Sequence, residues 1–215
     1  YRVDLFSQLV KCALATGFTL LTLFGADVRG VSVRMRAEYY LFLLTALLGL
    51  TLLSSSVELI TLFVALELSS YSLYLLVPMR TPSESLRLPM EAAVKYLLFG
   101  VTASGIMLFG MSWIFGLTGT TYLAKALPVM HAAGVQVTAA IALCMLLCGM
   151  FFKLAVFPFH FWAPDVYQGA SNDTTAFISS LPKVAAVAVL ARFCALAEPG
   201  PGPLVWLLTA LSIAS

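Results

Sequence analysis

The chain has 215 residues, of which 61% are hydrophobic and 10% are charged. Soluble domains carry about 25% charged residues, so this composition excludes an ordinary soluble globular protein and indicates one that lies largely within a membrane. The formal net charge of +2 is too small to indicate a nucleic-acid partner, and lipids are the expected surroundings.

Long apolar runs predict an all-α integral membrane protein. A helix needs about 20 mostly apolar residues to cross the hydrocarbon core, and only helices and closed barrels satisfy their backbone hydrogen bonds there. These runs are longer than barrel strands and lack their alternation of apolar and polar residues. We predict a single transmembrane domain over residues 1–215 whose seven helices lie at about Leu5–Phe24, Tyr39–Leu53, Val57–Val77, Pro89–Phe115, Val137–Phe157, Thr174–Cys194 and from Leu204 onward.

The sequence also predicts how these helices are connected. Ser54–Val57 is expected to be a tight turn, Gly116–Gln136 a polar loop that contains glycine, and Pro199–Pro203 a turn. The fifth helix is predicted to break at Pro158, because proline removes a helical hydrogen bond and clashes with the preceding turn. A broken continuation is expected through Trp162–Gln168.

Basic residues are concentrated in the loops of one side. That side carries Arg29, Arg34, Arg36, Arg80 and Arg87, whereas the other has little more than Arg2, Lys125 and Arg192. Because short loops rich in lysine and arginine stay on the inner side of a membrane, the arginine-rich loops are predicted to face the cytoplasm, or the matrix in an organelle.

Three ionisable residues fall deep inside predicted helices, namely Glu67, Lys153 and Lys183. A lysine at the centre of a membrane helix costs ~2.5–3.5 kcal/mol on insertion scales, and such residues mark ion or proton pathways. Glu67 is the natural counter-ion of Lys153. Three polar side chains follow Glu67 on its helix face and are expected to hold water or bind its carboxylate: Ser70, Tyr71 and Tyr74. The functional hypothesis is a proton relay through Glu67, Lys153 and Lys183, and the alternative is a static ion pair that fixes helix packing.

Weaker candidates each have a structural alternative. Lys11 is either a relay member or an anchor whose amine reaches the membrane surface. Lys95 is a possible pathway residue, but its spacing from Glu91 favours a salt bridge on one helix. His160 is a possible carrier between Lys153 and Lys183, or a hydrogen-bonding residue at the interface together with Asp165.

Several other residue types are expected to serve packing or anchoring. Trp162 and Tyr167 are expected in the aromatic belt at the membrane surface. Small residues are expected to let helices approach closely, and these are Gly100, Ser104, Gly105 and Gly110. The cysteines Cys12, Cys144, Cys148 and Cys194 lie in apolar runs without metal-ligand spacing, so no metal and no cofactor are predicted.

An ordered set of motifs covers nearly the whole chain. Its members are Leu66–Leu68, Glu91–Gly100, Phe152–His160, Trp162–Gly169 and Thr175–Ala186. The set resembles the antiporter-like membrane subunits of respiratory complex I, NADH:quinone oxidoreductase. Within that family, Pro164–Gly169 is most similar to the branch called subunit N in bacteria and subunit 2 in mitochondria.

The resemblance implies roles for the matched residues. Glu67 would be the carboxylate of the family's fifth helix, Lys153 the lysine of its broken seventh helix, and Lys183 the central lysine of the eighth, with His160 on the route between the lysines. It implies a fold of about fourteen helices in two inverted repeats, a general transporter device. This chain would hold the first repeat, and a second chain or a continuation would supply the other.

The resemblance further implies proton translocation driven by quinone reduction in other subunits, with no redox cofactor and no catalytic chemistry in this chain alone. The expected partners are the other membrane-arm subunits of the complex. The start at Tyr1 without methionine and the stop at Ser215 within an apolar run indicate a trimmed or processed chain or one piece of a longer unit. The mitochondrial inner membrane is the preferred location, and the bacterial plasma membrane is the alternative.

Two other functions remain open on the sequence. The chain could belong to a multi-subunit cation/proton antiporter, because those proteins are homologous and share the charge pattern. It could also be a structural membrane-arm subunit that no longer pumps.

Overall fold

The computed structural model describes residues 1–25, 30–81, 87–132 and 136–196, together with 205, 208–209 and 212–213. The predicted helix from Leu204 and the turn at Pro199–Pro203 lie outside the described residues, apart from the few just named. Within the described part the regular structure is helical, and its α-helices are α1 (Leu5–Phe24), α2 (Arg36–Ser54), α3 (Leu59–Leu76), α4 (Arg87–Thr118), α5 (Leu123–Ala132), α6 (Gln136–Leu154), α7 (Trp162–Gly169) and α8 (Asn172–Leu196).

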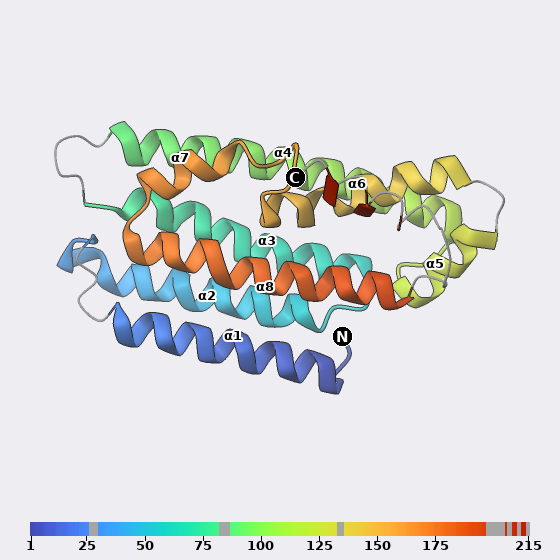
Figure 1. The fold of residues 1–215 in the computed structure, drawn as a ribbon, viewed down its shortest axis with the longest axis horizontal. Coiled ribbons are helices and arrows are strands. Elements are labelled where there is room, and N and C mark those ends of the chain that lie inside the picture. The colour runs from blue at the N-terminus through green and yellow to red at the C-terminus, as the bar shows by residue number, and fades with distance from the viewer. Residues whose placement is uncertain are drawn as a thin grey trace.

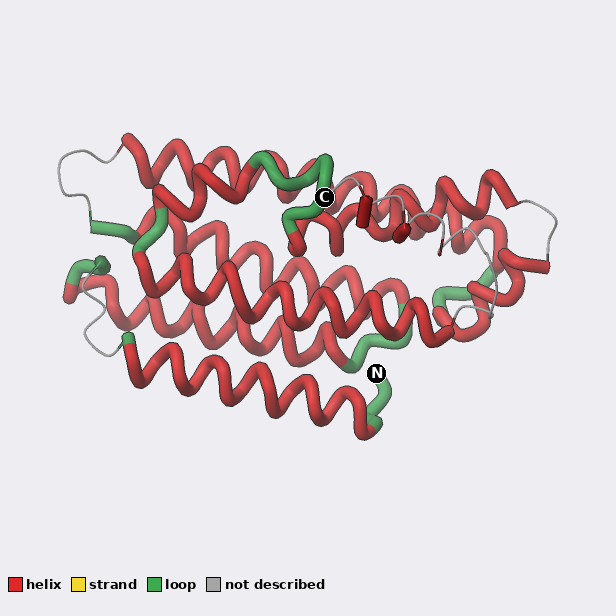
Figure 2. The backbone as a smooth tube through the Cα atoms, viewed as in Figure 1, coloured by secondary structure: helices red, strands yellow, loops and turns green. Residues whose placement is uncertain are grey.

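The long helices run side by side along the longest axis of the molecule (Figure 1). Among the described residues, six helices are long and apolar enough to cross a membrane: α1 to α4, α6 and α8. In Figure 2 the segment that joins α6 to α7 lies partway along the length of the bundle, whereas most of the other described loops lie toward its two ends. This arrangement confirms the prediction of an all-α membrane protein with a broken helix.

Glycines let two helix pairs approach to backbone contact. A Cβ on Gly49 of α2 would lie 2.6 Å from the backbone nitrogen of Ser69 on α3. On α4, a Cβ on Gly110 would lie 2.5 Å from the backbone nitrogen of Leu146 on α6. A Cβ on Gly105, also on α4, would meet none of the described residues within 4 Å. Close packing is therefore confirmed at Gly110, but the prediction is wrong at Gly105.

One predicted loop contains a helix. Within the predicted loop Gly116–Gln136, residues Leu123–Ala132 form α5, which includes Pro128 and buries Leu123 and Ala126. The start of α5 is tied to the beginning of α3, because Leu123 donates its backbone N–H to the carbonyl of Val57 at 3.1 Å. These apolar contacts with the bundle outweigh the weak helix signal of a segment that contains glycine and proline.

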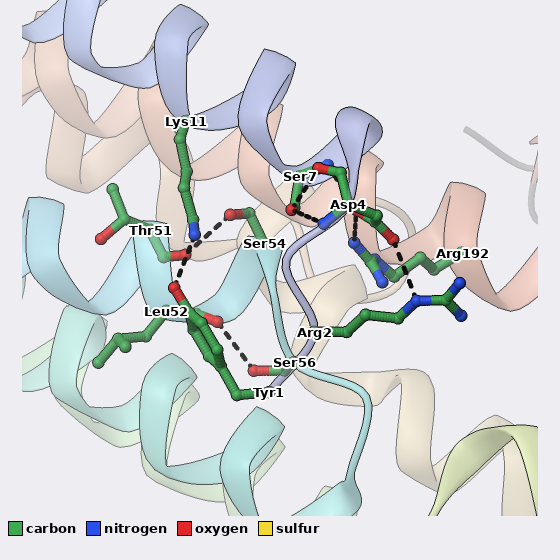
Figure 3. A network of polar contacts seen from close by, with 10 residues as sticks. All are labelled: Tyr1, Arg2, Asp4, Ser7, Lys11, Thr51, Leu52, Ser54, Ser56 and Arg192. Atoms are coloured by element: carbon green, nitrogen blue, oxygen red, sulfur yellow. Dashed lines mark hydrogen bonds and ion pairs between the residues drawn. The ribbon is translucent and has the colours of Figure 1, made fainter.

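The start of α1 is held by a capping box (Figure 3). Asp4 Oδ1 accepts the backbone N–H of Ser7 at 2.8 Å, and Ser7 Oγ accepts the backbone N–H of Asp4 at 3.0 Å. The same carboxylate pairs with Arg192 near the end of α8, at 2.9 Å. The Ser7 N–H first, and then Arg192, hold the pKa of Asp4 below its ordinary value.

We expect Asp4→Ala to lower the free energy of unfolding by about 0.5–2 kcal/mol, the usual cost of a lost N-cap. Because the folded pKa of Asp4 is depressed, its contribution is present above the unfolded pKa of about 3.9 and is lost as pH falls through the folded pKa. Thermal unfolding in detergent between neutral pH and pH 3 measures both effects. Asp4→Asn is the control, because asparagine also caps helices. If both variants lower the free energy of unfolding equally, the loss of the N-cap is not the reason for the destabilisation.

Candidate functional site

The fifth predicted helix ends earlier than its sequence indicates. It was expected to reach Phe157, but α6 ends at Leu154. The chain then turns through Ala155, whose φ of 58° is left-handed. The N–H groups of Val156 and Ala155 donate to the carbonyls of Phe151 and Phe152, each at 3.1 Å. This is the Schellman pattern of helix termination. It places the helix end a turn before Pro158, whose nitrogen cannot donate to the carbonyl of Leu154.

The break places Lys153 in the last turn of α6. The carbonyl end of a helix carries a partial negative charge, which favours a nearby cation. Lys153 is nevertheless 2% exposed, and among the described residues its Nζ has no hydrogen-bond or ion-pair partner. In Figure 1, α6 ends partway along the bundle. The structure therefore holds an unpaired amine inside the bundle, next to a helix end.

Glu67 lies on α3 and is 8% exposed. Its Oε1 accepts a hydrogen bond from Ser104 Oγ of α4 at 2.5 Å, and it makes no direct ion pair with Lys153. Its charge still acts on Lys153 through space. The sequence predicted the two buried charges but assigned Ser104 only to helix packing, because nothing in the sequence indicates which residue of another helix faces the carboxylate.

The three helices meet around Gly149, one turn before Lys153. A Cβ at Gly149 would lie 2.3 Å from Met107 Sδ of α4 and 3.3 Å from Leu66 Cδ1 of α3. Leu66 precedes Glu67, and Met107 lies one helical turn from Ser104. The absence of a side chain at Gly149 thus lets α3, α4 and α6 converge close to the buried carboxylate and the buried amine.

Aromatic side chains fill the space beside this junction. We call Tyr74, Tyr96, Phe152, Trp162 and Tyr167 the aromatic cluster. Tyr96 stacks on Phe152 and on Trp162, with ring centroids 5.6 and 4.7 Å apart, and Tyr74 meets Tyr96 edge-on at 4.8 Å. Trp162 is 1% exposed and donates its Nε1–H to the carbonyl of Phe152 at 3.1 Å. The prediction that Trp162 belongs to the aromatic belt at the membrane surface is wrong, because its ring is buried inside the bundle.

Lys183 lies on α8, directly after Pro182. Its Nζ is 5.8 Å from the centroid of the Tyr167 ring on α7, within the range of a cation–π contact. The sequence placed Tyr167 at the membrane surface and did not link it to Lys183. The hydroxyl of Tyr167 is buried and has no hydrogen-bond partner among the described residues.

The weaker candidates take structural positions. Lys95 pairs with Glu91 at 2.8 Å, as predicted, and with Asp165 of α7 at 2.9 Å. Lys11 donates to Tyr1 Oη at 2.6 Å, which favours the anchoring alternative. The ring of His160 lies against Phe157 and Phe161, both well exposed, so this structure does not bring His160 between the two lysines.

The short helix α7 is secured at both ends. Asp165 in its first turn meets Lys95 of α4, and its last carbonyls are met by Arg80, which follows α3. Arg80 Nη1 donates to the carbonyl of Gln168 at 2.5 Å and lies 3.4 and 3.3 Å from those of Gly169 and Ala170. Eight residues are too few for a helix to be stable alone, so these contacts fix its position.

Nothing in the described part of the chain groups three metal-binding side chains of histidine, cysteine, aspartate or glutamate. The site consists of one carboxylate, two amines, several hydroxyls and a helix break, all within apolar packing. Such groups can accept and release protons in a place from which bulk water is largely excluded.

A bundle of apolar helices with a broken member and buried ionisable residues is typical of membrane ion and proton transporters. Residues 56–215 match the family described as NADH:quinone oxidoreductase/Mrp antiporter, transmembrane. The chain belongs to this family.

Individual relatives agree with that assignment. The chain is 50% identical over 218 aligned residues to NADH-quinone oxidoreductase subunit N 2 of Opitutus terrae, with 100% of this chain and 45% of that protein covered. A chain of respiratory complex I from Thermus thermophilus superposes with a TM-score of 0.78 at 37% identity, covering 98% of this chain and 43% of that one. A chain of the Mrp complex from a Dietzia species gives 0.72 at 26% identity, covering 90% and 35%. The chain thus spans less than half the length of these relatives.

Proposed function

We propose that the chain is a proton-translocating part of the membrane arm of an NADH:quinone oxidoreductase. Its family and its likeness to subunit N support this proposal. The observation that carries it is Lys153, an amine that is 2% exposed and has no partner among the described residues, at a helix break near a buried carboxylate. A structural lysine would be expected to have an ion pair there, because an unpaired buried charge is costly.

The proposed relay begins at Glu67 and passes through Lys153 to Lys183. When the Glu67 carboxylate comes closer to Lys153, the protonated amine is favoured; when the carboxylate is held by Ser104, the neutral amine is favoured and the proton is released. Moving one charge against 100 mV costs ~2.3 kcal/mol, which is less than two pKa units at ~1.36 kcal/mol each. Small movements of the carboxylate are therefore sufficient.

The proposal also covers cofactors, the second repeat, the minor proton carriers and the location of the chain. The chain would bind no redox cofactor, quinone would be reduced in other subunits, and a continuation or another chain would supply the second repeat. His160 remains a proposed carrier and Lys95 a weaker one. The bacterial relatives favour the bacterial plasma membrane over the mitochondrial one, and we propose that the arginine-rich loops face the cytoplasm.

The test uses the assembled complex that contains this chain, reconstituted in vesicles. We expect Lys183→Met to lower proton translocation by about 10²-fold or more, in line with the loss of a positioned proton-transfer group. Lys125→Met is the matched control, because Lys125 is an exposed lysine over a tyrosine ring, also at 5.8 Å. Unchanged translocation in Lys183→Met would leave only the structural role.

A cation/proton antiporter is the second candidate, favoured by the structural likeness to the Mrp complex. Vesicles containing the protein without redox substrates distinguish the two functions. An antiporter would exchange sodium for protons under an imposed gradient, whereas the proposed subunit would move protons only when quinone is being reduced.

A further inference from the structure

Three polar atoms are buried around the aromatic cluster without a hydrogen-bond partner among the described residues. They are Lys153 Nζ, Tyr74 Oη and Tyr167 Oη. Buried polar groups are almost always hydrogen-bonded, and exceptions call for an explanation. Three exceptions beside one cluster are more than packing alone requires, since phenylalanine could replace each of the two tyrosines and an apolar side chain could replace the lysine.

Tyr167 contacts Lys183 and is linked through Trp162 to the residue that precedes Lys153. On one side, the ammonium of Lys183 faces its ring at 5.8 Å. On the other, its ring meets Trp162 edge-on at 6.0 Å, and Trp162 is bound to the carbonyl of Phe152, the residue before Lys153. A continuous set of contacts therefore runs from the end of α6 through α7 to α8, and Tyr167 contributes the hydroxyl along it.

A phenol suits such a position. Its hydroxyl donates one hydrogen bond and accepts others at the same time. Because the Tyr167 hydroxyl is buried and has no hydrogen-bond partner among the described residues, it is available to order hydrogen-bonding groups between the two amines.

We propose that Tyr167 is a positioning residue for proton transfer between Lys153 and Lys183, acting through its hydroxyl. The proposal rests on the proposed function of the two lysines. Tyr74, whose oxygen abuts Gly100, lies on the same helix as Glu67 and is not part of this assignment.

The test is Tyr167→Phe in the assembled complex, because phenylalanine keeps the ring and its contact with Lys183 and removes only the hydroxyl. Proton translocation during quinone reduction is expected to slow by about tenfold, below the effect of losing a direct proton-transfer group. The ratio of rates in H2O and D2O is expected to rise, because proton transfer becomes slower than the other steps. Assembly and the thermal midpoint should not change, since the hydroxyl has no partner among the described residues.

Tyr122→Phe is the matched control. Tyr122 also has a lysine amine 5.8 Å from its ring, that of Lys125, but it lies on the exposed surface at the start of α5. The Tyr122→Phe complex should translocate protons at the rate of the unmodified complex. The assignment of Tyr167 is overturned if Tyr167→Phe also leaves this rate unchanged, or if it lowers the rate without changing the ratio of rates in H2O and D2O. The result for Lys183→Met tests the proposed function independently of Tyr167. The proposed function stands if Lys183→Met stops proton translocation, and it is contradicted if Lys183→Met leaves translocation unchanged.

Discussion

Lys153→Met is expected to stop proton translocation and to make the protein more stable. The substitution replaces an amine that is 2% exposed by an apolar side chain of similar length. Removal of an unpaired buried polar group should raise the free energy of unfolding by about 1–3 kcal/mol. The relay would at the same time lose the group that accepts the proton, and translocation should fall by ~10²-fold or more.

Two measurements on the same samples separate these effects. Thermal unfolding of the detergent-solubilised protein gives stability, and dye-detected acidification of vesicles during quinone reduction gives translocation. Lys11→Met is the control, because Lys11 binds Tyr1 at one end of α1. A Lys153→Met protein that is destabilised and still translocates protons would mean that the lysine is a structural residue.

Gly110→Ala is expected to lower the free energy of unfolding. The new Cβ would lie 2.5 Å from the Leu146 nitrogen and 2.9 Å from the Ala142 oxygen, both backbone atoms that cannot turn away. The two helices would have to separate, and overpacking of this kind costs about 1–3 kcal/mol or more. Because α6 also carries Lys153, translocation should fall as well.

Gly105→Ala provides the matched control on the same helix. A Cβ there would meet none of the described residues within 4 Å, and alanine favours the helix over glycine by up to about 1 kcal/mol. Gly105→Ala should therefore be neutral or slightly stabilising in the same unfolding experiment. Equal destabilisation by both variants would contradict the close α4–α6 contact.

Much of the fold follows from hydrophobicity alone. The bounds of α1 were predicted without error, and α3 and α8 begin and end within two residues of the prediction. A membrane helix is recognised because its whole length is apolar, which a single sequence records directly. The exact end of α6 was not predicted, because the chain leaves the helix at Leu154 through a left-handed alanine, a position usually taken by glycine.

The candidate site was predictable in its charges but not in its contacts. Glu67, Lys153 and Lys183 stand out because charged residues are rare in apolar runs. The contact of Ser104 with Glu67 was not predicted, because a serine on one helix face looks the same whether it meets lipid or a carboxylate. A tryptophan near a proline likewise looks the same at a membrane surface and inside a bundle. Such facts depend on which helices are neighbours, and a single sequence does not record that.

The two attachments of α7 link it to both helices of the buried carboxylate site. Arg80 connects the last carbonyls of α7 to the end of the helix that carries Glu67, and Lys95 connects its first turn to the helix that carries Ser104. Tyr167 lies on α7 itself. A neighbouring subunit that displaces the arginine-bearing end of the bundle would therefore shift the carboxylate, its serine and the tyrosine together rather than one by one.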